Sequence, residues 1–371
     1  MAAENPFVFS GPLDSEQMVD RDREANELAT LAAGGHWARL EAPRRYGKTT
    51  LLRRVLAEVE QSGMASALVD LEGVLSLGGI VIRIERAYSR SLKGKARQTV
   101  DRLFRSWDLG LSLGAAGFAV ELRANPRLDA ESVLLRLLEL PEEVHARTTA
   151  RVLVAFDEFQ DLLRVEGADG VLRSVIQHQR ESASYAFAGS APSLMSRLFE
   201  DPSAPLLEQA VTVRLGPLPA GEVAGYLTDR FQATGKDPGQ ALDPLLRFCR
   251  GHPQRLMLLA HQLWRQTPDG ATADEETWLQ AREAALDQAE RVLHATYSAL
   301  PTNEQRVATA LSISPGKPGE ADVRALVGIG KGSVHAALRQ LRGRGDAIDT
   351  PGGPRITDPL LEMWLRERME G

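Results

Sequence analysis

The segment at residues 41–52 constrains the fold of this chain more than any other stretch. It reads Glu-Ala-Pro-Arg-Arg-Tyr-Gly-Lys-Thr-Thr-Leu-Leu. Residues 36–40 before it can form a short strand, and residues 49–60 carry leucines and valines at helical spacing. Glycine, lysine and a hydroxyl residue between a strand and a helix are typical of a phosphate-binding loop, whose amides and ammonium group surround phosphate oxygens. The segment therefore predicts a nucleotide site.

The roles within this loop follow from its chemistry. We expect Lys48 to reach the β- and γ-phosphates and the hydroxyl of Thr49 to ligate Mg²⁺. The usual pattern has glycine five positions before Gly47, where this chain has Ala42, and a glycine-only backbone conformation there would exclude alanine. The alternative is a basic turn without a ligand. The loop residues predicted to contact the nucleotide are Pro43, Arg44, Arg45, Tyr46, Gly47, Lys48, Thr49 and Thr50.

A second segment carries two carboxylates directly after an apolar run. Residues 151–156 have the length and composition of a buried parallel strand, and Asp157 and Glu158 follow it. Ligands collect at the carboxyl ends of such strands, so Asp157 is predicted to hold the Mg²⁺ shell and Glu158 to act as general base toward water. The alternative is the solvated start of a helix. Phosphoryl transfer with Lys48, Mg²⁺ and Glu158 would be mainly electrostatic and positional.

The base of the nucleotide is predicted from what the chain lacks. GTP recognition ordinarily uses an Asn-Lys-x-Asp segment, and no asparagine of this sequence is followed by lysine. Adenine is therefore the better prediction, with ATP or ADP and Mg²⁺ as the cofactors.

With both segments placed, the chain resembles the archaeal-type ATPases of the STAND class of P-loop NTPases, which are relatives of the AAA+ and origin-recognition ATPases. The likeness covers most of the chain and rests on Pro-Arg-Arg-x-Gly-Lys-Thr at 43–49 and Asp-Glu-Phe-Gln at 157–160. The resemblance implies nucleotide contacts by Arg21 and by His252 with Pro253. It also implies that Ser190 senses the γ-phosphate or the catalytic water, although a turn with a helix N-cap explains Ser190 equally well.

One departure from the family concerns charge compensation. The family often carries a Pro-Leu-Tyr-Gly-Arg stretch, and this chain has Pro-Leu-Leu-Glu-Gln at 205–209. Gln209 cannot replace an arginine finger, whereas Arg214 is a candidate substitute at a different position. Because such an arginine can contribute about a thousandfold in rate, we expect slow turnover or activation by a partner.

The fold class predicted is α/β, with a P-loop NTPase parallel sheet of five core strands in AAA+/STAND-like order. Strands are expected at 36–40, 65–71, 151–156, 184–188 and 211–215, with helices between them. An insertion at 77–141 would hold extra helices and a Gly-rich hairpin near 109–118. The predicted domains are an ATPase core at 1–216, a helical lid at 217–296 and a winged helix at 297–371.

The winged helix is predicted from a helix-turn-helix at 321–342 and a Gly-Gly turn between short strands at 346–349 and 354–356. Residues 297–371 contain 10 Lys/Arg against 9 Asp/Glu, so this domain is barely basic, and contact with double-stranded DNA or with a protein partner stays open. The residues predicted to contact DNA, if it is bound, are Lys331, Ser333, His335, Arg339, Arg342 and Arg355. The segment 358–365 resembles the family's closing helix, which is expected to pack back on the fold.

Composition excludes some classes of protein. The net charge of −6 argues against a general polyanion binder. A single cysteine, Cys249, excludes an internal disulfide and fits a reducing compartment. The first residues lack a signal-peptide pattern, and the weakly polar stretch at 109–120 is too short to span a bilayer, so cytoplasmic localisation is expected.

Three functions fit the sequence. The leading one is an ATPase switch, in which nucleotide held between sheet and lid sets the orientation of the winged helix, with nucleotide-dependent self-association left open. The second is a DNA-binding regulator that uses nucleotide as a structural ligand. The third is a catalytically inactive assembly scaffold. Retention of Lys48, Thr49, Asp157 and Glu158 together favours the first over the third.

Overall fold

The computed structural model describes residues 4–11, 18–106 and 129–370, and the chain forms two compact units. One, here called the sheet unit, comprises Arg21–Ala42 and Lys48–Leu215. The other, here called the helical unit, comprises Met1–Asp20, Pro43–Gly47 and Gly216–Gly371. The phosphate-binding loop is therefore shared, because its first residues belong to the helical unit and Lys48 begins the second segment of the sheet unit.

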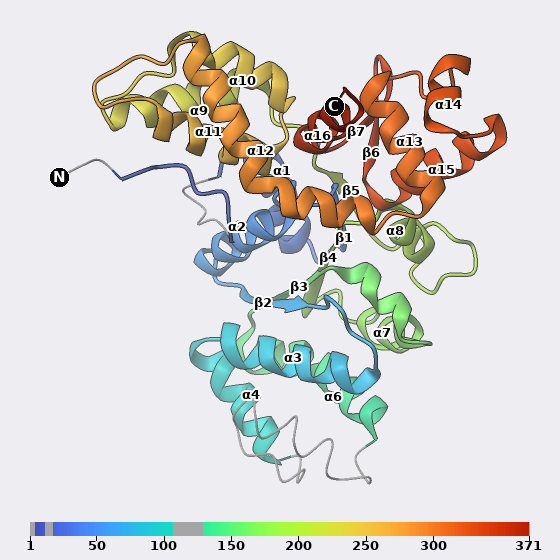
Figure 1. The fold of residues 1–371 in the computed structure, drawn as a ribbon. Helices are drawn as coiled ribbons and strands as arrows, with labels where there is room; N and C mark the ends of the chain where they lie inside the picture. Colours follow the sequence, from blue (N-terminus) through green and yellow to red (C-terminus); the bar gives the residue numbers. More distant parts are fainter. Residues whose placement is uncertain (1–3, 12–17, 107–128, 371) are drawn as a thin grey trace. The chain divides into compact units, whose positions relative to one another are not determined.

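The described part of the sheet unit is built on a five-stranded parallel sheet with the order β2-β3-β4-β1-β5 (Figure 1). This confirms the predicted fold class and strand order. Each strand lies within two residues of its predicted position. The strands are β1 (Ala38–Glu41), β2 (Ala65–Asp70), β3 (Val152–Asp157), β4 (Ala183–Gly189) and β5 (Val211–Arg214).

Helices cover both faces of this sheet, because its central strands are apolar on both sides. In β3, Val154 and Phe156 join the hydrophobic cluster that includes α3 and α6, whereas Leu153 and Ala155 face α1 and α2. Successive side chains of a strand point to opposite faces, so one apolar run supports two layers of helices. The helices of this unit are α1 (Asp22–Ala33), α2 (Lys48–Gln61), α3 (Leu77–Ser91), α4 (Gly94–Ser106), α6 (Ala130–Thr148), α7 (Ala168–Ile176) and α8 (Pro192–Phe199), with a 3₁₀ turn η2 (Phe159–Arg164).

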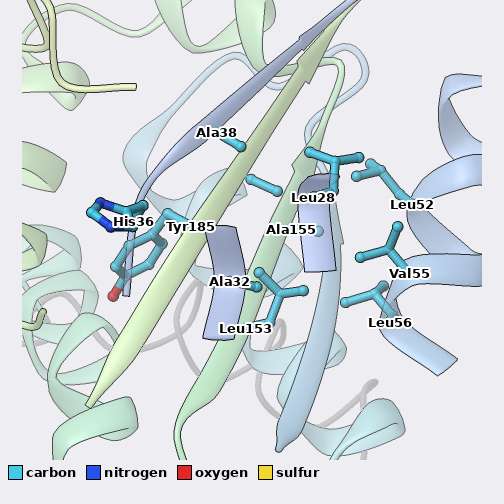
Figure 2. Close-up of a pocket in the computed structure, with 11 residues that line it drawn as sticks. Leu28, Ala32, His36, Ala38, Leu52, Val55, Leu56, Leu153, Ala155 and Tyr185 are labelled. Carbon is cyan, nitrogen blue, oxygen red and sulfur yellow. The ribbon is translucent and has the colours of Figure 1, made fainter. Parts of the chain in front are cut away.

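The contact between α2 and the sheet is close-packed and apolar. Figure 2 shows Leu52, Val55 and Leu56 of α2 facing Leu153 and Ala155 of β3. The gap between them has a volume of about 10 Å³. A gap of that size, lined mainly by hydrocarbon, offers a water molecule too few polar partners. It is therefore a packing void of the core, and the helix that begins with Lys48 is held firmly against the sheet.

The predicted insertion at 77–141 contains α3, α4 and the first part of α6. Pro141 lies inside α6, and the helix continues past it to Thr148. The hairpin predicted near 109–118, and the weakly polar stretch at 109–120, lie outside the described residues.

The helical unit joins the predicted lid and the C-terminal module in one hydrophobic cluster. Trp364 of the last helix lies edge-on to Tyr297 of α12, with ring centroids 5.8 Å apart. Two helices, α14 and α15, and the antiparallel strand pair β6–β7 lie at the positions where the sequence predicts a helix-turn-helix and a hairpin. The elements are α9 (Ala220–Ala233), a 3₁₀ turn η3 (Gly239–Ala241), α10 (Leu242–Cys249), α11 (Pro253–Gln266), α12 (Glu275–Ser298), α13 (Thr302–Ile313), α14 (Ala321–Val327), α15 (Lys331–Arg344), β6 (Ala347–Thr350), β7 (Gly353–Ile356) and α16 (Pro359–Glu370).

Candidate nucleotide site

Strand order brings the predicted site residues of the sheet unit to one edge. Strand β4 lies between β1 and β3, and all three run parallel. Their carboxyl ends therefore place Ser190, which follows β4, between the loop after β1 and the carboxylates at the end of β3. The carboxyl edge of a parallel sheet is where ligands of α/β proteins bind.

Thr49 and Asp157 are in direct contact at this edge. The hydroxyl Oγ1 of Thr49 donates a hydrogen bond of 2.5 Å to Oδ2 of Asp157, across 108 residues of chain. Burial raises the pKa of Asp157, while the hydrogen bond from Thr49 acts in the opposite direction. Two oxygen atoms of the kind that Mg²⁺ prefers as ligands are thus adjacent, at the two residues for which the sequence analysis predicts a metal role.

Lys48 begins α2 and is almost fully buried, with 5% of its surface exposed. Its ammonium Nζ donates a hydrogen bond of 3.2 Å to the carbonyl oxygen of Ala42. A buried ammonium group that bonds a loop carbonyl is already desolvated and directed into the loop. This contact closes the loop from its first residue to its lysine.

The backbone of the loop explains why Ala42 is tolerated. Positive φ angles occur at Arg45 (68°) and Gly47 (87°), whereas Ala42 is not among the residues with positive φ. Alanine is therefore compatible with the conformation at position 42, and its methyl group is buried. The departure from the usual motif does not distort this loop.

Glu158 is held by two neutral donors. Its Oε2 accepts hydrogen bonds of 2.6 Å from Ser190 Oγ and of 2.6 Å from Gln160 Nε2. Glu158 has a φ angle of 48°, in the left-handed region that non-glycine residues adopt only uncommonly. Ser190 does not cap α8, because the N-cap residue is Ala191 and the serine hydroxyl is bound to Glu158.

Gln160 is the site residue that sequence reasoning missed. Besides bonding Glu158, its Oε1 accepts a hydrogen bond of 3.2 Å from the backbone N–H of Ser190. Gly189 makes room for it, since a Cβ atom there would lie 2.7 Å from Gln160 Oε1 and 2.3 Å from Met195 Sδ. The signal was present in the Asp-Glu-Phe-Gln segment, where Gln160 follows Glu158 by two positions.

The remaining sheet-unit candidates lie at the ends of their elements. Arg21, with a φ angle of 81°, precedes α1, and its guanidinium lies 3.0 Å from Oε1 of Glu24. Arg214 ends β5 in register with Glu41 of β1, and its Nε lies 3.3 Å from Oε2 of Glu41. Gln209 donates its amide to the backbone oxygen of Leu207. The candidate substitute arginine thus lies at the correct edge of the sheet and is paired with a glutamate.

In the helical unit, His252 packs against the loop residue Tyr46. The rings are 5.0 Å apart in an edge-on arrangement, and both side chains are buried. Nδ1 of His252 caps α11 by accepting the N–H of Arg255, and Pro253 occupies the first turn. Burial lowers the pKa of His252 to about 4, so the imidazole is neutral near pH 7.

A buried ion pair follows directly from this helix start. Nε of Arg255 lies 2.8 Å and 2.9 Å from the two carboxylate oxygens of Asp358, which Nη2 also contacts. Burial alone would raise the pKa of Asp358, but the charge and hydrogen bonds of Arg255 outweigh it, and the pKa is lowered. Arg45 of the loop is close enough to Asp358 to interact electrostatically with it.

The residues predicted to contact DNA separate into two groups. Lys331, His335 and Arg339 are exposed and lie at four-residue intervals on α15, so they share one face of that helix. The remaining three differ in environment. Ser333 is partly buried, Arg342 is paired with Asp349 of the hairpin, and Arg355 is bound to Glu362 of α16 at 2.8 Å.

Comparison with known proteins supports the fold. No family profile matches the sequence, and no curated protein matches it. The Walker-type ATPase of Pyrococcus abyssi is similar in structure, with a TM-score of 0.72 and 18% identity over 97% of this chain and 99% of that chain. The ORC2 protein of Aeropyrum pernix, in ADPNP–ADP complexes, gives a TM-score of 0.58 and 14% identity over 98% of both chains.

The strand order and these two structural likenesses identify a P-loop NTPase fold of the AAA+ kind. The ORC2 protein of Aeropyrum pernix and the Walker-type ATPase of Pyrococcus abyssi share that fold with this chain. Within the described ranges, no helix is both long and apolar enough to cross a lipid bilayer.

Proposed function

We propose that this protein binds Mg²⁺-ATP at the carboxyl edge of its sheet and hydrolyses it slowly, as a nucleotide-dependent switch. The observation that carries the proposal is the contact between Thr49 and Asp157 beside the buried Lys48. Lys48 and Thr49 are neighbours in the sequence, and Asp157 lies 108 residues beyond Thr49. Together they offer an ammonium group for phosphate oxygens and two oxygen atoms for a magnesium ion.

The residues fit the proposed ligands. Thr49 and Asp157 offer hard oxygen donors, and Mg²⁺ typically takes one or two such protein ligands while keeping water and phosphate oxygens. When bound, the ion would neutralise charge that develops on the phosphate oxygens. The positive φ angles at Arg45 and Gly47 curve the loop, so its amides can face a phosphate.

The chain's own residues supply the remaining chemistry. Lys48 exchanges the carbonyl of Ala42 for phosphate oxygens, which costs little because the ammonium is already desolvated. Glu158 uses the oxygen Oε1, to which no described residue donates a hydrogen bond, to accept a proton from the attacking water. Ser190 and Gln160 are positioning residues, because both fix Oε2 of Glu158 and so aim Oε1.

The switch would act through the loop's first residues. Arg45 interacts with Asp358, and Tyr46 packs on His252, both within the helical unit. Phosphate bound by the loop would compete with Asp358 for Arg45, since both are anions. The electrostatic interaction between Arg45 and Asp358, which precedes α16, would then weaken when nucleotide binds.

Isothermal titration with ATP, ADP and GTP in the presence of Mg²⁺ tests this proposal. We expect ATP and ADP to bind, GTP to bind more weakly, and the substitution Lys48→Ala to weaken ATP binding at least tenfold. Lys93→Ala is the matched control, because Lys93 is an exposed lysine of the same unit that pairs with Glu60. Equal ATP affinity in the Lys48→Ala and parent proteins would refute the site.

A second candidate function is DNA binding by α15, which the shared exposed face of Lys331, His335 and Arg339 favours. Titration of double-stranded DNA at two salt concentrations tests it, because phosphate contacts weaken steeply with salt. Replacing Lys331 and Arg339 with alanine should reduce the affinity and flatten its salt dependence, with ATP binding unchanged. Absence of salt-dependent binding in the parent protein would exclude this function.

A further inference from the structure

The helical unit contains a cavity of about 390 Å³ that the proposed nucleotide chemistry does not use. It lies between α10, α12, β7 and α16. Five arginines and two glutamates line it, together with apolar side chains that include Phe248 and Met363. The arginines are Arg247, Arg250, Arg282, Arg355 and Arg366.

The charges of this cavity do not balance. Glu362 of α16 is 3% exposed and lies 2.8 Å from Arg355, 3.1 Å from Arg250 and 3.4 Å from Arg366. One carboxylate therefore serves three guanidinium groups. With Glu367 as the second acid, five positive charges face two negative ones, so the lining carries a net formal charge of +3.

Two of the arginines have no acidic partner in the described part of the chain. No described carboxylate forms an ion pair with Arg247 or Arg282. The Nε atom of Arg282 is buried and has no hydrogen-bond partner among residues 4–11, 18–106 and 129–370. A buried donor without an acceptor is costly, and a structure retains it where a ligand or water completes the bond.

We propose that this arginine cavity binds a small phosphorylated molecule with an apolar part next to its phosphoryl group. A phosphoryl group presents several acceptor oxygens, so it can bond Arg247 and Arg282 at once, which the fork geometry of guanidinium favours. Phe248 and Met363 supply apolar surface for the rest of the ligand. The volume lies within the usual range for small-molecule sites, which is about 300–1,000 Å³.

Such a ligand would stabilise the helical unit. Its phosphoryl group would link Arg247 of α10 to Arg282 of α12, next to the ion pairs that Glu362 of α16 forms with Arg250 and Arg355. Binding would therefore raise the Tm by mass action. This site does not depend on the proposed nucleotide chemistry.

The test uses phenyl phosphate as the probe and the full chain carrying Lys48→Ala, so that the phosphate-binding loop cannot account for binding. Affinity is measured by isothermal titration, and folding is checked by thermal unfolding without ligand. The test variant adds Arg247→Gln and Arg282→Gln. The control variant adds Arg265→Gln and Arg291→Gln, which change two exposed arginines of α11 and α12 outside the cavity.

We expect phenyl phosphate to bind the Lys48→Ala protein and its control variant equally, and the test variant at least tenfold more weakly. Phenol should not bind, and inorganic phosphate should bind more weakly than phenyl phosphate. Absence of phenyl phosphate binding, or equal affinity in the test variant, would overturn the proposal. Binding that appears only when Lys48 is intact would assign the phosphate to the loop and also overturn it.

If the test variant fails to fold, the lysine variant Arg247→Lys with Arg282→Lys replaces it. Lysine keeps both charges but loses the planar fork, so binding should still weaken measurably. Unchanged affinity in that variant would count against recognition by guanidinium groups.

Discussion

The carboxyl edge of the sheet and the arginine cavity manage buried charge in opposite ways. At the sheet edge, the acids Asp157 and Glu158 receive neutral donors from Thr49, Ser190 and Gln160. In the cavity, one glutamate receives three charged arginines, and positive charge is left over. Hydrogen bonds from neutral donors do not cancel the charge of a carboxylate, so it can still attract a cation or accept a proton. Guanidinium groups in excess over carboxylates can attract an anion instead.

The largest expected effect is on turnover at the sheet edge. Glu158→Gln keeps acceptors for Ser190 and Gln160 but removes the base, so kcat should fall by about 10²–10⁴-fold while Mg²⁺-ATP affinity stays within threefold. Single-turnover hydrolysis and titration measure the two quantities separately. A variant as fast as the parent would remove Glu158 from the base role and leave the edge with a binding function alone.

The next effect concerns stability in the cavity. Glu362→Gln would leave Arg250, Arg355 and Arg366 close together without their acid, and removal of one partner of a buried ion pair costs about 3–5 kcal/mol. Because the arginines are partly exposed, we expect about 2–3 kcal/mol in the free energy of unfolding, measured with urea. Glu367→Gln, at an exposed position of the same helix, should change it by less than about 0.5 kcal/mol.

A third prediction follows from the buried His252. Its pKa is about 4 in the folded chain and about 6.5 when unfolded, so the unfolded state binds more protons between these values. Above pH 6.5 the histidine is neutral in both states and costs no stability. As the pH falls toward 4, protonation of His252 in the unfolded chain lowers the free energy of unfolding. His252→Asn supplies a capping oxygen in place of Nδ1 and does not titrate over that range, so its stability should fall less, by about 2 kcal/mol.

The measurement is urea unfolding of both proteins at several pH values from 7 to 4.5. Asp358 is electrostatically coupled to His252, so the difference between the two proteins reports the titration of the histidine together with its effect on Asp358. Parallel curves would show that His252 does not titrate with folding, and the assignment of a neutral buried imidazole would be wrong.

The smallest effect should come from the positioning residues. Ser190→Ala removes one of two hydrogen bonds to Glu158 Oε2, so kcat should fall about tenfold, with ATP affinity unchanged. Ser190→Thr, which keeps the hydroxyl, should restore most of the rate. A loss of ATP affinity equal to the loss of rate would indicate that Ser190 contacts the γ-phosphate instead of orienting Glu158.

The positions of the strands, and of the loop between β1 and α2, were predicted well because the periodicity of a strand or a helix can be recognised from neighbouring residues alone. Strand β3 and the start of α2 at Lys48 lie within one residue of expectation. Contacts that join distant residues were not predictable. Nothing local in the sequence indicates that Arg355 pairs with Glu362 of α16 or that Asp358 pairs with Arg255. Whether Arg355 contacts DNA stays a prediction.

The allocation of Pro43–Gly47 to the helical unit limits how the protein can be divided. The ring of Tyr46 is 3% exposed, and its aromatic neighbour His252 lies far along the chain. A fragment that stops before residue 216 would therefore carry a complete sheet but leave this tyrosine in water. Neither unit is one continuous segment of the sequence. A truncation meant to isolate the phosphate-binding loop with its sheet would therefore disturb the packing of that loop.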